Sequence, residues 1–316
     1  MATTRLFYAS DIHGSDLCFR KFLGAARAFQ ADALVLGGDL TGKILVPVVK
    51  AGSRYTVYSQ TPPLEDVDAS TLIEVRKKLE DFGQYVRVLH ADELEQFQLD
   101  ADLRQQFLEA AALESVIRWL DRAEEFLRPL GVECFMMAGN DDHVGVVQAI
   151  EASSFVVNHD EKVVEVRGRI PLIGLGSSNF TPFSSPRELS EDEIAQWLES
   201  LFSALPDPGK AILNTHCPPF GTGLDFAPEL GDAKDVVSYG GQPRMVPVGS
   251  TAILESIQRF QPLVGLHGHC HDSKHRTEIG KSLCVNPGSQ YSEGVLVGVV
   301  VDLMEGANPH CQFVSG

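Results

Sequence analysis

The sequence lacks three features that would each place it in another class of protein. It has no apolar run near the length of about 20 residues that a membrane helix requires. The run at residues 6–9 is too short for the core of a secretory signal. Its six cysteines are scattered and form no C-x-x-C pair, which indicates reduced thiols rather than a disulfide framework. We therefore expect a cytoplasmic protein with no membrane segment.

Positive charge is also scarce: the chain has 26 basic and 43 acidic residues, which gives a net charge of -17. An acidic surface repels the phosphates of nucleic acids and anionic membranes, so we expect neither non-specific nucleic-acid binding nor membrane adhesion. The chain has 316 residues, 44% of them hydrophobic, which is typical of a globular protein with a sizeable core. Nothing in the sequence indicates an oligomeric state.

What the chain does contain is a series of short apolar segments, each followed by a polar cluster. These segments lie at residues 5–10, 33–36, 132–137, 211–214 and 262–266. Parallel strands that are buried on both faces look continuously apolar in this way. An amphipathic stretch at residues 16–30 separates the first two, which predicts a strand–helix–strand unit and an α/β fold. In such folds ligands bind at the carboxyl ends of the strands.

Residues 44–130 interrupt this pattern. Residues 44–49 and 55–58 predict a hairpin with Gly52 and Ser53 at its turn, and residues 64–128 predict two or three helices because they contain few helix breakers. The clearest helical repeat places Phe107, Ala111, Leu113, Ile117, Leu120 and Phe126 on one face. We expect a single domain over residues 1–316, in which residues 44–130 form a hairpin and a helical cap above the site.

The polar clusters at the strand ends supply the donors that a pair of metal ions requires. Carboxylate and amide oxygens suit hard divalent cations, and imidazole suits Mn, Fe, Ni and Zn. A dinuclear site has its ions about 3.5–4 Å apart, so its donors must come from several strand ends. The candidate ligands are Asp11, His13, Asp39, Asn140, His216, His269 and His271.

Each cluster alone also has a structural explanation. Asp11 and His13 fit a strand-exit turn, and Asp39 after glycine fits ordinary turn chemistry. A lone His216 would fit a buried structural histidine. The segment at residues 268–271 is the stronger signal, because it places histidines at two alternate positions of an extended segment. Only the combination of all five clusters favours a metal site.

The order of these clusters resembles the calcineurin-like metallophosphoesterase family, whose blocks are D-x-H, G-D, G-N-H-[DE], a later H and G-H-x-H. Here they read Asp11-Ile12-His13, Gly38-Asp39, Gly139-Asn140-Asp141-Asp142, His216 and Gly268-His269-Cys270-His271. The stretches at residues 215–222, 248–250 and 286–289 make the chain most similar to the bacterial and archaeal phosphoesterases related to cyclic-nucleotide phosphodiesterases. The match runs from the first strand to about residue 289, apart from the insertion.

The resemblance implies a four-layer α/β/β/α sandwich of the metallophosphoesterase type with a helical insertion. It also implies a division of the ligands between two divalent transition-metal ions, of which Mn is favoured over Fe, Ni and Zn. Asp11, His13, Asp39 and His271 would hold the first ion, and Asp39 would bridge to a second ion completed by Asn140, His216 and His269.

The implied activity is hydrolysis of a small-molecule phosphoester, with phosphodiesters favoured over phosphomonoesters. A hydroxide that bridges the metals would attack phosphorus, and Asn140 would stabilise charge on the phosphate oxygens. The alternative is a non-catalytic metal-binding scaffold that uses the helical insertion to bind a protein partner. Because every ligand position is filled, catalysis is favoured.

Four further residues are candidates for the catalytic or substrate-binding machinery. Asp141 stands where the family usually has histidine, and an anionic side chain there would repel phosphate. His143 is a possible substitute for that histidine, or else lies on the first turn of a helix. Asn179 is a candidate substrate contact or a loop turn. Arg244 is a candidate phosphate clamp, since guanidinium binds oxyanions bidentately, or else a surface arginine.

Overall fold

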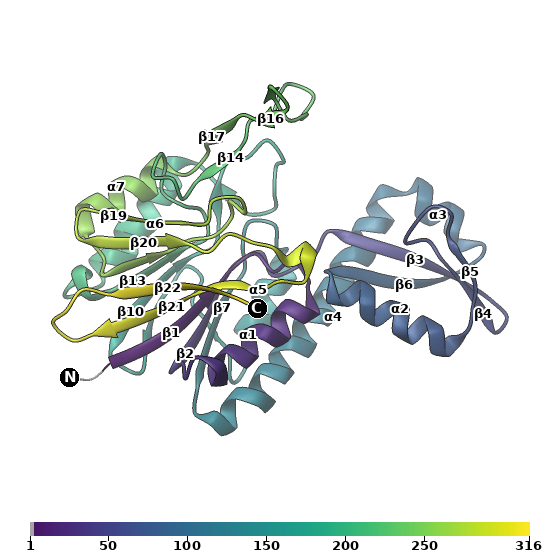
Figure 1. The fold of residues 1–316 in the computed structure, drawn as a ribbon, viewed down its shortest axis with the longest axis horizontal. Helices are drawn as coiled ribbons and strands as arrows, with labels where there is room; N and C mark the ends of the chain where they lie inside the picture. The colour runs from purple at the N-terminus through teal and green to yellow at the C-terminus, as the bar shows by residue number, and fades with distance from the viewer. Residues whose placement is uncertain (1–2) are drawn as a thin grey trace.

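The structure, a computed structural model, describes residues 3–316 and is built on two six-stranded sheets (Figure 1). The first sheet has the order β22-β21-β1-β2-β7-β8. Its strands are β1 (Thr3–Ala9), β2 (Ala33–Gly37), β7 (Glu133–Met137), β8 (Val157–Asn158), β21 (Val297–Met304) and β22 (His310–Ser315). The four strands from β1 to β8 are parallel, and β21 and β22 add an antiparallel edge. The carboxyl ends of β1, β2 and β7 therefore share one edge.

The second sheet has the order β19-β20-β18-β13-β10-β9. Its strands are β9 (Val163–Val166), β10 (Ile170–Leu175), β13 (Ile212–Thr215), β18 (Val264–Leu266), β19 (His275–Ile279) and β20 (Ser282–Asn286). The central four are parallel, and β9 and β19 pair antiparallel at the two edges. The five strands that the sequence predicts all lie at their expected places, and the mixed α/β class is confirmed.

Apolar side chains fill the space between the two sheets and cover their outer faces. A core cluster joins Tyr8 and Val35 of the first sheet to Ile212 and Leu266 of the second. The outer face of the first sheet packs against α1 (Asp16–Ala28), α4 (Ala101–Leu127) and α5 (Val144–Glu151). The outer face of the second packs against α6 (Glu191–Ser203) and α7 (Thr251–Phe260). Burial of both sheets fixes the strand ends that carry the polar clusters.

The insertion differs from its sequence prediction because half of it is a sheet. Strands β3 (Ile44–Ala51) and β4 (Arg54–Val57) form the expected hairpin, but β5 (Leu64–Val67) and β6 (Gln84–His90) extend it to a four-stranded sheet of order β5-β4-β3-β6. Helices α2 (Ala69–Asp81) and α3 (Glu93–Leu99) accompany it. The purely helical character expected for residues 64–128 is therefore wrong. Figure 1 shows this subdomain projecting to one side of the two large sheets.

The subdomain is attached to the loop that follows β1. Ser15 Oγ donates to the carbonyl of Asp81 at 2.6 Å, and Arg20 on α1 pairs with the Asp81 carboxylate at 2.8 Å. Gly42 N, at the start of the insertion, donates to the Tyr85 hydroxyl at 3.0 Å. These contacts connect α2 to the segment that carries Asp11 and His13, and β6 to the segment that carries Asp39, so the insertion supports both segments from the side.

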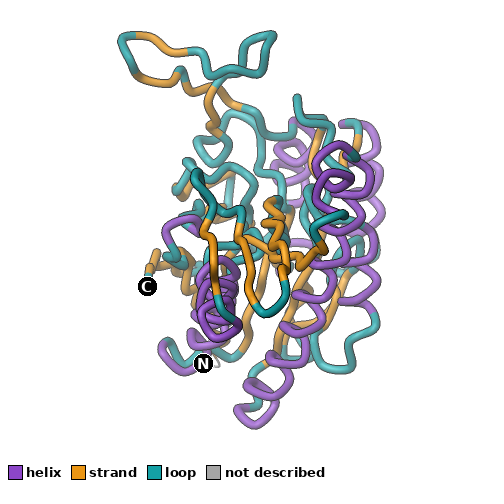
Figure 2. Tube along the Cα trace, turned by 90° about the vertical axis from the view of Figure 1, so that its right-hand side faces the viewer, coloured by secondary structure: helices purple, strands orange, loops and turns teal. Residues whose placement is uncertain are grey.

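An arm formed by residues 226–247 projects beyond the second sheet (Figures 1 and 2). At its base β14 (Phe226–Pro228) pairs with β17 (Met245–Pro247), and at its tip β15 (Ser238–Tyr239) pairs with β16 (Gln242–Pro243). A shorter loop at residues 180–185 lies between β11 (Ser178–Asn179) and β12 (Glu188–Leu189). In the part of the chain from residue 3 to 316, no helix is both long and apolar enough to cross a membrane.

Candidate metal centre

All seven candidate ligands lie just beyond the carboxyl ends of strands. Asp11 and His13 follow β1, Asp39 follows β2 and Asn140 follows β7 of the first sheet. From the second sheet, His216 follows β13, and His269 and His271 follow β18. Except for the partly exposed His271 and His269, these residues are almost wholly buried. The two sheets therefore bring residues from 11 to 271 to one place.

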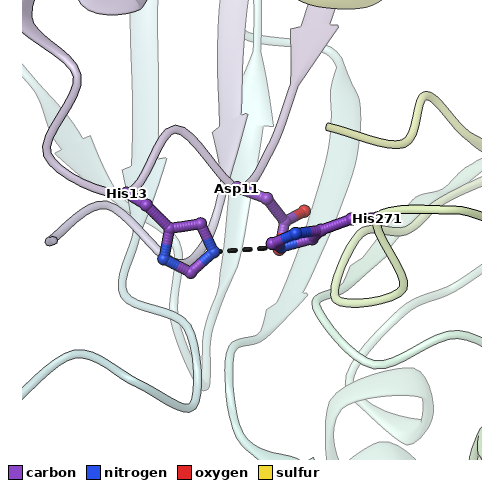
Figure 3. A group of neighbouring side chains, drawn as sticks. All are labelled: Asp11, His13 and His271. Carbon is purple, nitrogen blue, oxygen red and sulfur yellow. Dashed lines mark hydrogen bonds and ion pairs between the residues drawn. The ribbon is translucent and has the colours of Figure 1, made fainter. Parts of the chain in front are cut away.

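The first cluster of donors consists of Asp11, His13 and His271, whose ligand atoms lie within 4.8 Å of one another. Figure 3 shows the two imidazoles approaching each other beside the Asp11 carboxylate, with 3.0 Å between the Nε2 atoms. The His271 Nε2 lies 3.4 Å from Asp11 Oδ1. Two imidazole nitrogens and a carboxylate oxygen that converge in this way form a donor set suited to Mn, Fe, Ni or Zn.

The second cluster consists of Asp39, His216 and His269. The His216 Nδ1 lies 3.0 Å from the carbonyl of Gly37, which fixes the proton on that nitrogen. The opposite nitrogen, Nε2, is buried, makes no hydrogen bond and lies 3.3 Å from Asp39 Oδ1. A buried imidazole nitrogen left without a partner but aimed at a carboxylate has the geometry of a metal ligand. This atom fits a cation in the site.

Asp39 faces both clusters. Its Oδ1 lies 3.3 Å from His216 Nε2 and its Oδ2 lies 3.6 Å from His13 Nε2. Asn140 joins the second cluster, since its Oδ1 lies 2.9 Å from His269 Nδ1. The two oxygens of one carboxylate are thus directed at two different sets of histidines.

The pKa values of the histidines reflect this concentration of charge. Burial lowers the pKa of His216, but the carboxylates of Asp39 and Asp11 outweigh burial and raise it to about 10. Burial and the neighbouring His216 lower the pKa of His269 to about 4. Burial and His271 lower the pKa of His13 to about 4. Burial lowers the pKa of His271, but the Asp11 carboxylate outweighs burial and raises it. A cation bound between the carboxylates would replace the protons on His216 and His271 and leave every imidazole neutral, as ligation requires.

The backbone at the site is strained at four of the seven candidate ligands. Asp11, His13, Asp39 and His269 have φ values of 57°, 39°, 48° and 66°, in the left-handed region that non-glycine residues rarely adopt. Such strain costs about 1–3 kcal/mol per residue and collects at functional sites, where it holds side chains in the required geometry. Here it directs donors from two sheets to one point.

Close approach between the loops explains two of the motif glycines. A Cβ at Gly139 would lie 2.2 Å from Asp39 Oδ1, and a Cβ at Gly268 would lie 2.4 Å from Asp11 Oδ2. Both distances are below van der Waals contact, so a side chain at either position would displace a carboxylate of the donor set. The glycine before Asn140 and the glycine before His269 are therefore required by the site itself.

A cavity of about 610 Å³ opens over the two clusters. Its polar floor consists of His13, Asp39, Lys43, Asn140, Asp141, His269, His271 and Tyr291. One wall comes from the 180–185 loop. The other comes from the arm and from Val248, the residue that follows the arm. Among the residues that the structure describes, the subdomain of residues 44–100 contributes none to the lining. The lining therefore gives no support to the expectation that the insertion caps the site, and the two shorter segments form the walls of the cavity.

Known proteins resemble this chain in both sequence and structure, although no family model matches it. An uncharacterized protein of Methanocaldococcus jannaschii is 31% identical over 158 residues, which cover 49% of this chain and 64% of that protein. The chain thus spans less than two thirds of this relative's length. The UDP-2,3-diacylglucosamine hydrolase of Yersinia pestis is 24% identical over 220 residues, 69% of this chain and 85% of that enzyme.

The fold is shared with the solved structure of the protein TT1561 from Thermus thermophilus. The two superpose with a TM-score of 0.56 over 100% of this chain and 99% of the other, at 15% sequence identity. At this identity the likeness shows the fold. The ligand motifs that this fold brings together are those by which the chain resembles the calcineurin-like metallophosphoesterases.

Asp141, which replaces the usual histidine of the metallophosphoesterases, is not an isolated anion. Its carboxylate forms an ion pair with Lys43 and accepts a hydrogen bond from Ser185 Oγ at 2.8 Å. Burial raises the pKa of Asp141, but Lys43 outweighs burial and lowers it to about 2. The carboxylate also lies within ligand distance of His13 and Asp39. The structure thus places Asp141 in the site together with a compensating cation that the sequence argument did not include.

Asp142, the next residue, connects two of the ligand loops and was not among the candidates. Its buried carboxylate accepts from Leu40 N at 3.0 Å, Thr41 N at 2.9 Å, Thr41 Oγ1 at 2.6 Å and Gly139 N at 2.8 Å. These four bonds join the loop after Asp39 to the loop before Asn140. Asp142 therefore positions ligands without contacting them.

Arg187 also positions the turn that carries Asn140, and it was not among the residues predicted from the sequence. Its Nη1 donates to the carbonyls of Ala138 at 2.7 Å and Gly139 at 3.2 Å, and its backbone N donates to the carbonyl of Asn140 at 3.1 Å. Its guanidinium forms an ion pair with the buried Asp160. No local motif marks Arg187, because it reaches the turn at residues 138–140 from a distant loop.

Three candidate residues lie outside the cavity. The His143 Nδ1 accepts from Gly145 N at 3.1 Å and caps α5, so His143 lies at the start of that helix, which is the structural alternative given for it above. Asn179 donates to the carbonyls of Val248 at 3.2 Å and Gly249 at 3.3 Å, and therefore anchors the base of the arm rather than contacting the cavity. Arg244 pairs with Glu229 at 2.9 Å on the arm and does not line the cavity, which fits the alternative of a surface arginine.

Proposed function

We propose that this chain is a dinuclear metal-dependent phosphoesterase that hydrolyses phosphodiesters in preference to phosphomonoesters. Two divalent transition-metal ions, with Mn favoured, would be held by the two clusters that share Asp39. We also propose that the two six-stranded sheets and the helices on their outer faces form the four-layer α/β/β/α sandwich of the family.

The observation that carries the proposal is the position of Asp39, whose two oxygens face different histidines at 3.3 and 3.6 Å. A single ion would need only one of these oxygens. The unpartnered His216 Nε2 supports the same conclusion, because a structural histidine at this depth would have a hydrogen-bond partner.

When bound, the ions would supply the Lewis acidity that makes water nucleophilic at neutral pH and offsets the charge of the phosphate. The protein itself would orient the ester. The Asn140 amide lies at the floor of the cavity, where it can donate to a phosphate oxygen. Lys43 and Tyr291 line the same floor, so an ammonium and a phenol hydroxyl are also within the cavity.

The proposal is tested by metal analysis together with turnover of bis(p-nitrophenyl) phosphate by Mn-loaded protein. We expect two ions per chain and hydrolysis of this diester faster than that of p-nitrophenyl phosphate. UDP-2,3-diacylglucosamine, which the name of the Yersinia relative specifies, belongs in the substrate screen beside cyclic nucleotides. Full metal occupancy without turnover of any ester would instead favour a metal-binding scaffold, and no more than one bound ion would contradict the dinuclear site.

Lys43→Ala should lower kcat/KM for phosphoesters by roughly 10- to 100-fold, the range expected on loss of a charge-assisted hydrogen bond. The side chain is 61% exposed, but its ammonium pairs with Asp141 at the cavity floor. Removal of the ammonium leaves the Asp141 carboxylate without its cation. The value of kcat/KM should therefore fall more for a dianionic monoester than for a monoanionic diester. The measurement is kcat/KM for both aryl esters at equal metal content.

Lys43→Arg is the matched control, because it keeps the cation and should recover most of the activity. If Lys43→Ala loses activity equally on both esters, the lysine does not compensate the charge of Asp141. If Lys43→Ala retains full activity, it plays no part in binding the phosphate.

A further inference from the structure

The cavity has a charged floor and a largely apolar wall. The wall contains Phe180 and Phe183 of the 180–185 loop, and Pro228, Leu230, Val246 and Val248 on the side of the arm. Phe180 is 69% exposed and Phe183 is 63% exposed, which is unusual for aromatic side chains of this size. Since both line the cavity beside the metal clusters, a ligand bound there would bury them.

The 180–185 loop is held in place by hydrogen bonds to the site. Ser185 Oγ donates to Asp141 at 2.8 Å, and Ser185 N donates to Glu188 Oε1 at 2.9 Å. Phe183 N donates to Thr181 Oγ1 at 3.2 Å, and the Thr181 hydroxyl in turn donates to Glu188. The two phenylalanines are therefore presented by an ordered loop that is bonded directly to the cavity floor.

The arm is fixed on the opposite side of the cavity. Ser273, two residues beyond His271, accepts from Phe226 N and donates to Phe226 O, both at 2.8 Å. The Lys234 ammonium of the arm lies 5.9 Å from the centre of the Phe183 ring. The arm and the loop thus both line the cavity and approach each other at Lys234 and Phe183.

The charges of the lining limit what can enter. Lys43 is the single lysine or arginine among the lining residues of the cavity, and it is already paired with Asp141. The carboxylates of Asp39 and Asp141 line the same space, and so does that of Glu229, which is paired with Arg244. Beyond the phosphate held at the metal clusters, a second anionic group would meet no unpaired lysine or arginine among the lining residues, since the ammonium of Lys234 lies outside the lining, 5.9 Å from the Phe183 ring. Apolar surface, by contrast, would meet apolar surface on both walls.

We propose that the substrate is a phosphoester with one charged phosphate and a bulky apolar group, which lies between Phe180 and Phe183 on one side and the arm on the other. This inference rests on the proposed phosphoesterase function, which supplies the position of the phosphate. The apolar group can be an alkyl chain or an aromatic ring, since both bury apolar surface against such walls.

The test uses phosphodiesters that share one p-nitrophenyl leaving group and differ in the second ester group, which is methyl, hexyl or phenyl. We expect kcat/KM to rise at least about tenfold from methyl to hexyl, to phenyl or to both, because apolar area is buried on binding. The double variant with Phe180→Ala and Phe183→Ala should reduce this ratio to less than about threefold. Tyr239→Ala, which removes an equally exposed aromatic ring at the tip of the arm and outside the cavity lining, should leave the ratio unchanged.

A binding measurement separates this inference from the proposed function. Titration calorimetry of Mn-loaded protein with dimethylphosphinate, hexyl(methyl)phosphinate and methyl(phenyl)phosphinate measures Kd without turnover, because these monoanions contain no P–O–C bond to hydrolyse. A Kd at least about tenfold lower for the hexyl or phenyl compound, dependent on the two phenylalanines, supports the apolar group even if no ester is hydrolysed. Preference for hexyl alone identifies an alkyl chain, and preference for phenyl alone identifies an aromatic ring. Equal Kd values for all three phosphinates would overturn the inference, whatever the outcome of the turnover assay.

Discussion

Asp39→Asn is expected to lower the metal content from two ions to at most one per chain, and kcat/KM for a phosphodiester by at least about a thousand-fold. The carboxylate lies between His216 at 3.3 Å and His13 at 3.6 Å, with a different oxygen directed at each histidine. Asparagine keeps the shape of the side chain and tolerates the positive φ of 48° at this position. The variant therefore removes the negative charge while adding little backbone strain.

Asn140→Ala provides the comparison for this result. The Asn140 amide contacts only the second cluster, where its Oδ1 lies 2.9 Å from His269 Nδ1. The Asn140→Ala variant should therefore lose less bound metal than the Asp39→Asn variant. Metal content after dialysis, measured by elemental analysis on both variants, decides between them. Retention of two ions by Asp39→Asn would show that Asp39 does not bridge.

Asp142→Ala should destabilise the metal-free protein by about 3–5 kcal/mol. The carboxylate is fully buried and accepts four hydrogen bonds, three of them from backbone N–H groups of Leu40, Thr41 and Gly139. Truncation would leave three buried donors without an acceptor, and each such donor costs about 1–3 kcal/mol. Urea unfolding without metal measures this loss separately from any loss of metal binding.

Thr41→Val is the matched control for Asp142→Ala. It removes only the hydroxyl that donates to Asp142 at 2.6 Å and leaves the backbone bonds in place, so it should cost about 1 kcal/mol. If Asp142→Ala costs no more than Thr41→Val, the backbone donors find other acceptors and the two loops do not depend on Asp142.

The donors of the metal centre were predictable because the signal for each one is local. A short apolar strand such as β2 is followed at once by Gly38 and Asp39, and the rule that parallel strands place their ends at one edge brings such donors together. The same argument applies to β13 with His216 and to β18 with His269. The sequence therefore predicts which residues converge, and the structure brings all seven together.

The insertion was harder to predict, because its strands are short and surrounded by helix-forming residues. Strand β6 has no regular alternation of apolar and polar residues, with the neighbours Tyr85 and Val86 both buried and Val88 exposed, and it closely follows the charged helix α2. Helix α4 was expected, yet its buried face was not. Its buried residues are Ala112, Ser115, Val116, Trp119, Leu120, Ala123 and Leu127.

The buried face of α4 was predicted wrongly because the helix packs against two different neighbours. Its first half faces the insertion, where Phe107 stacks on Phe97 and lies under Arg87. Its second half faces the main core, where Trp119 stacks on Phe19. A single apolar stripe fitted along the whole helix combines two faces that point in different directions. The supports of the site, Asp142 and Arg187, escaped prediction for a related reason, since their partners are fixed only by the tertiary fold.

The attachment of the subdomain to the loop after β1 limits how freely the insertion can be exchanged. A segment that adds nothing to the cavity would, on that ground alone, be a module that can be shortened or replaced by a fusion partner. Yet Asp81 and Tyr85 provide acceptors for Ser15 Oγ and Gly42 N, which closely follow the candidate ligands His13 and Asp39. A chimaera that removes residues 44–100 must therefore supply two substitute acceptors at the junction, or the loops that carry His13 and Asp39 lose their lateral support.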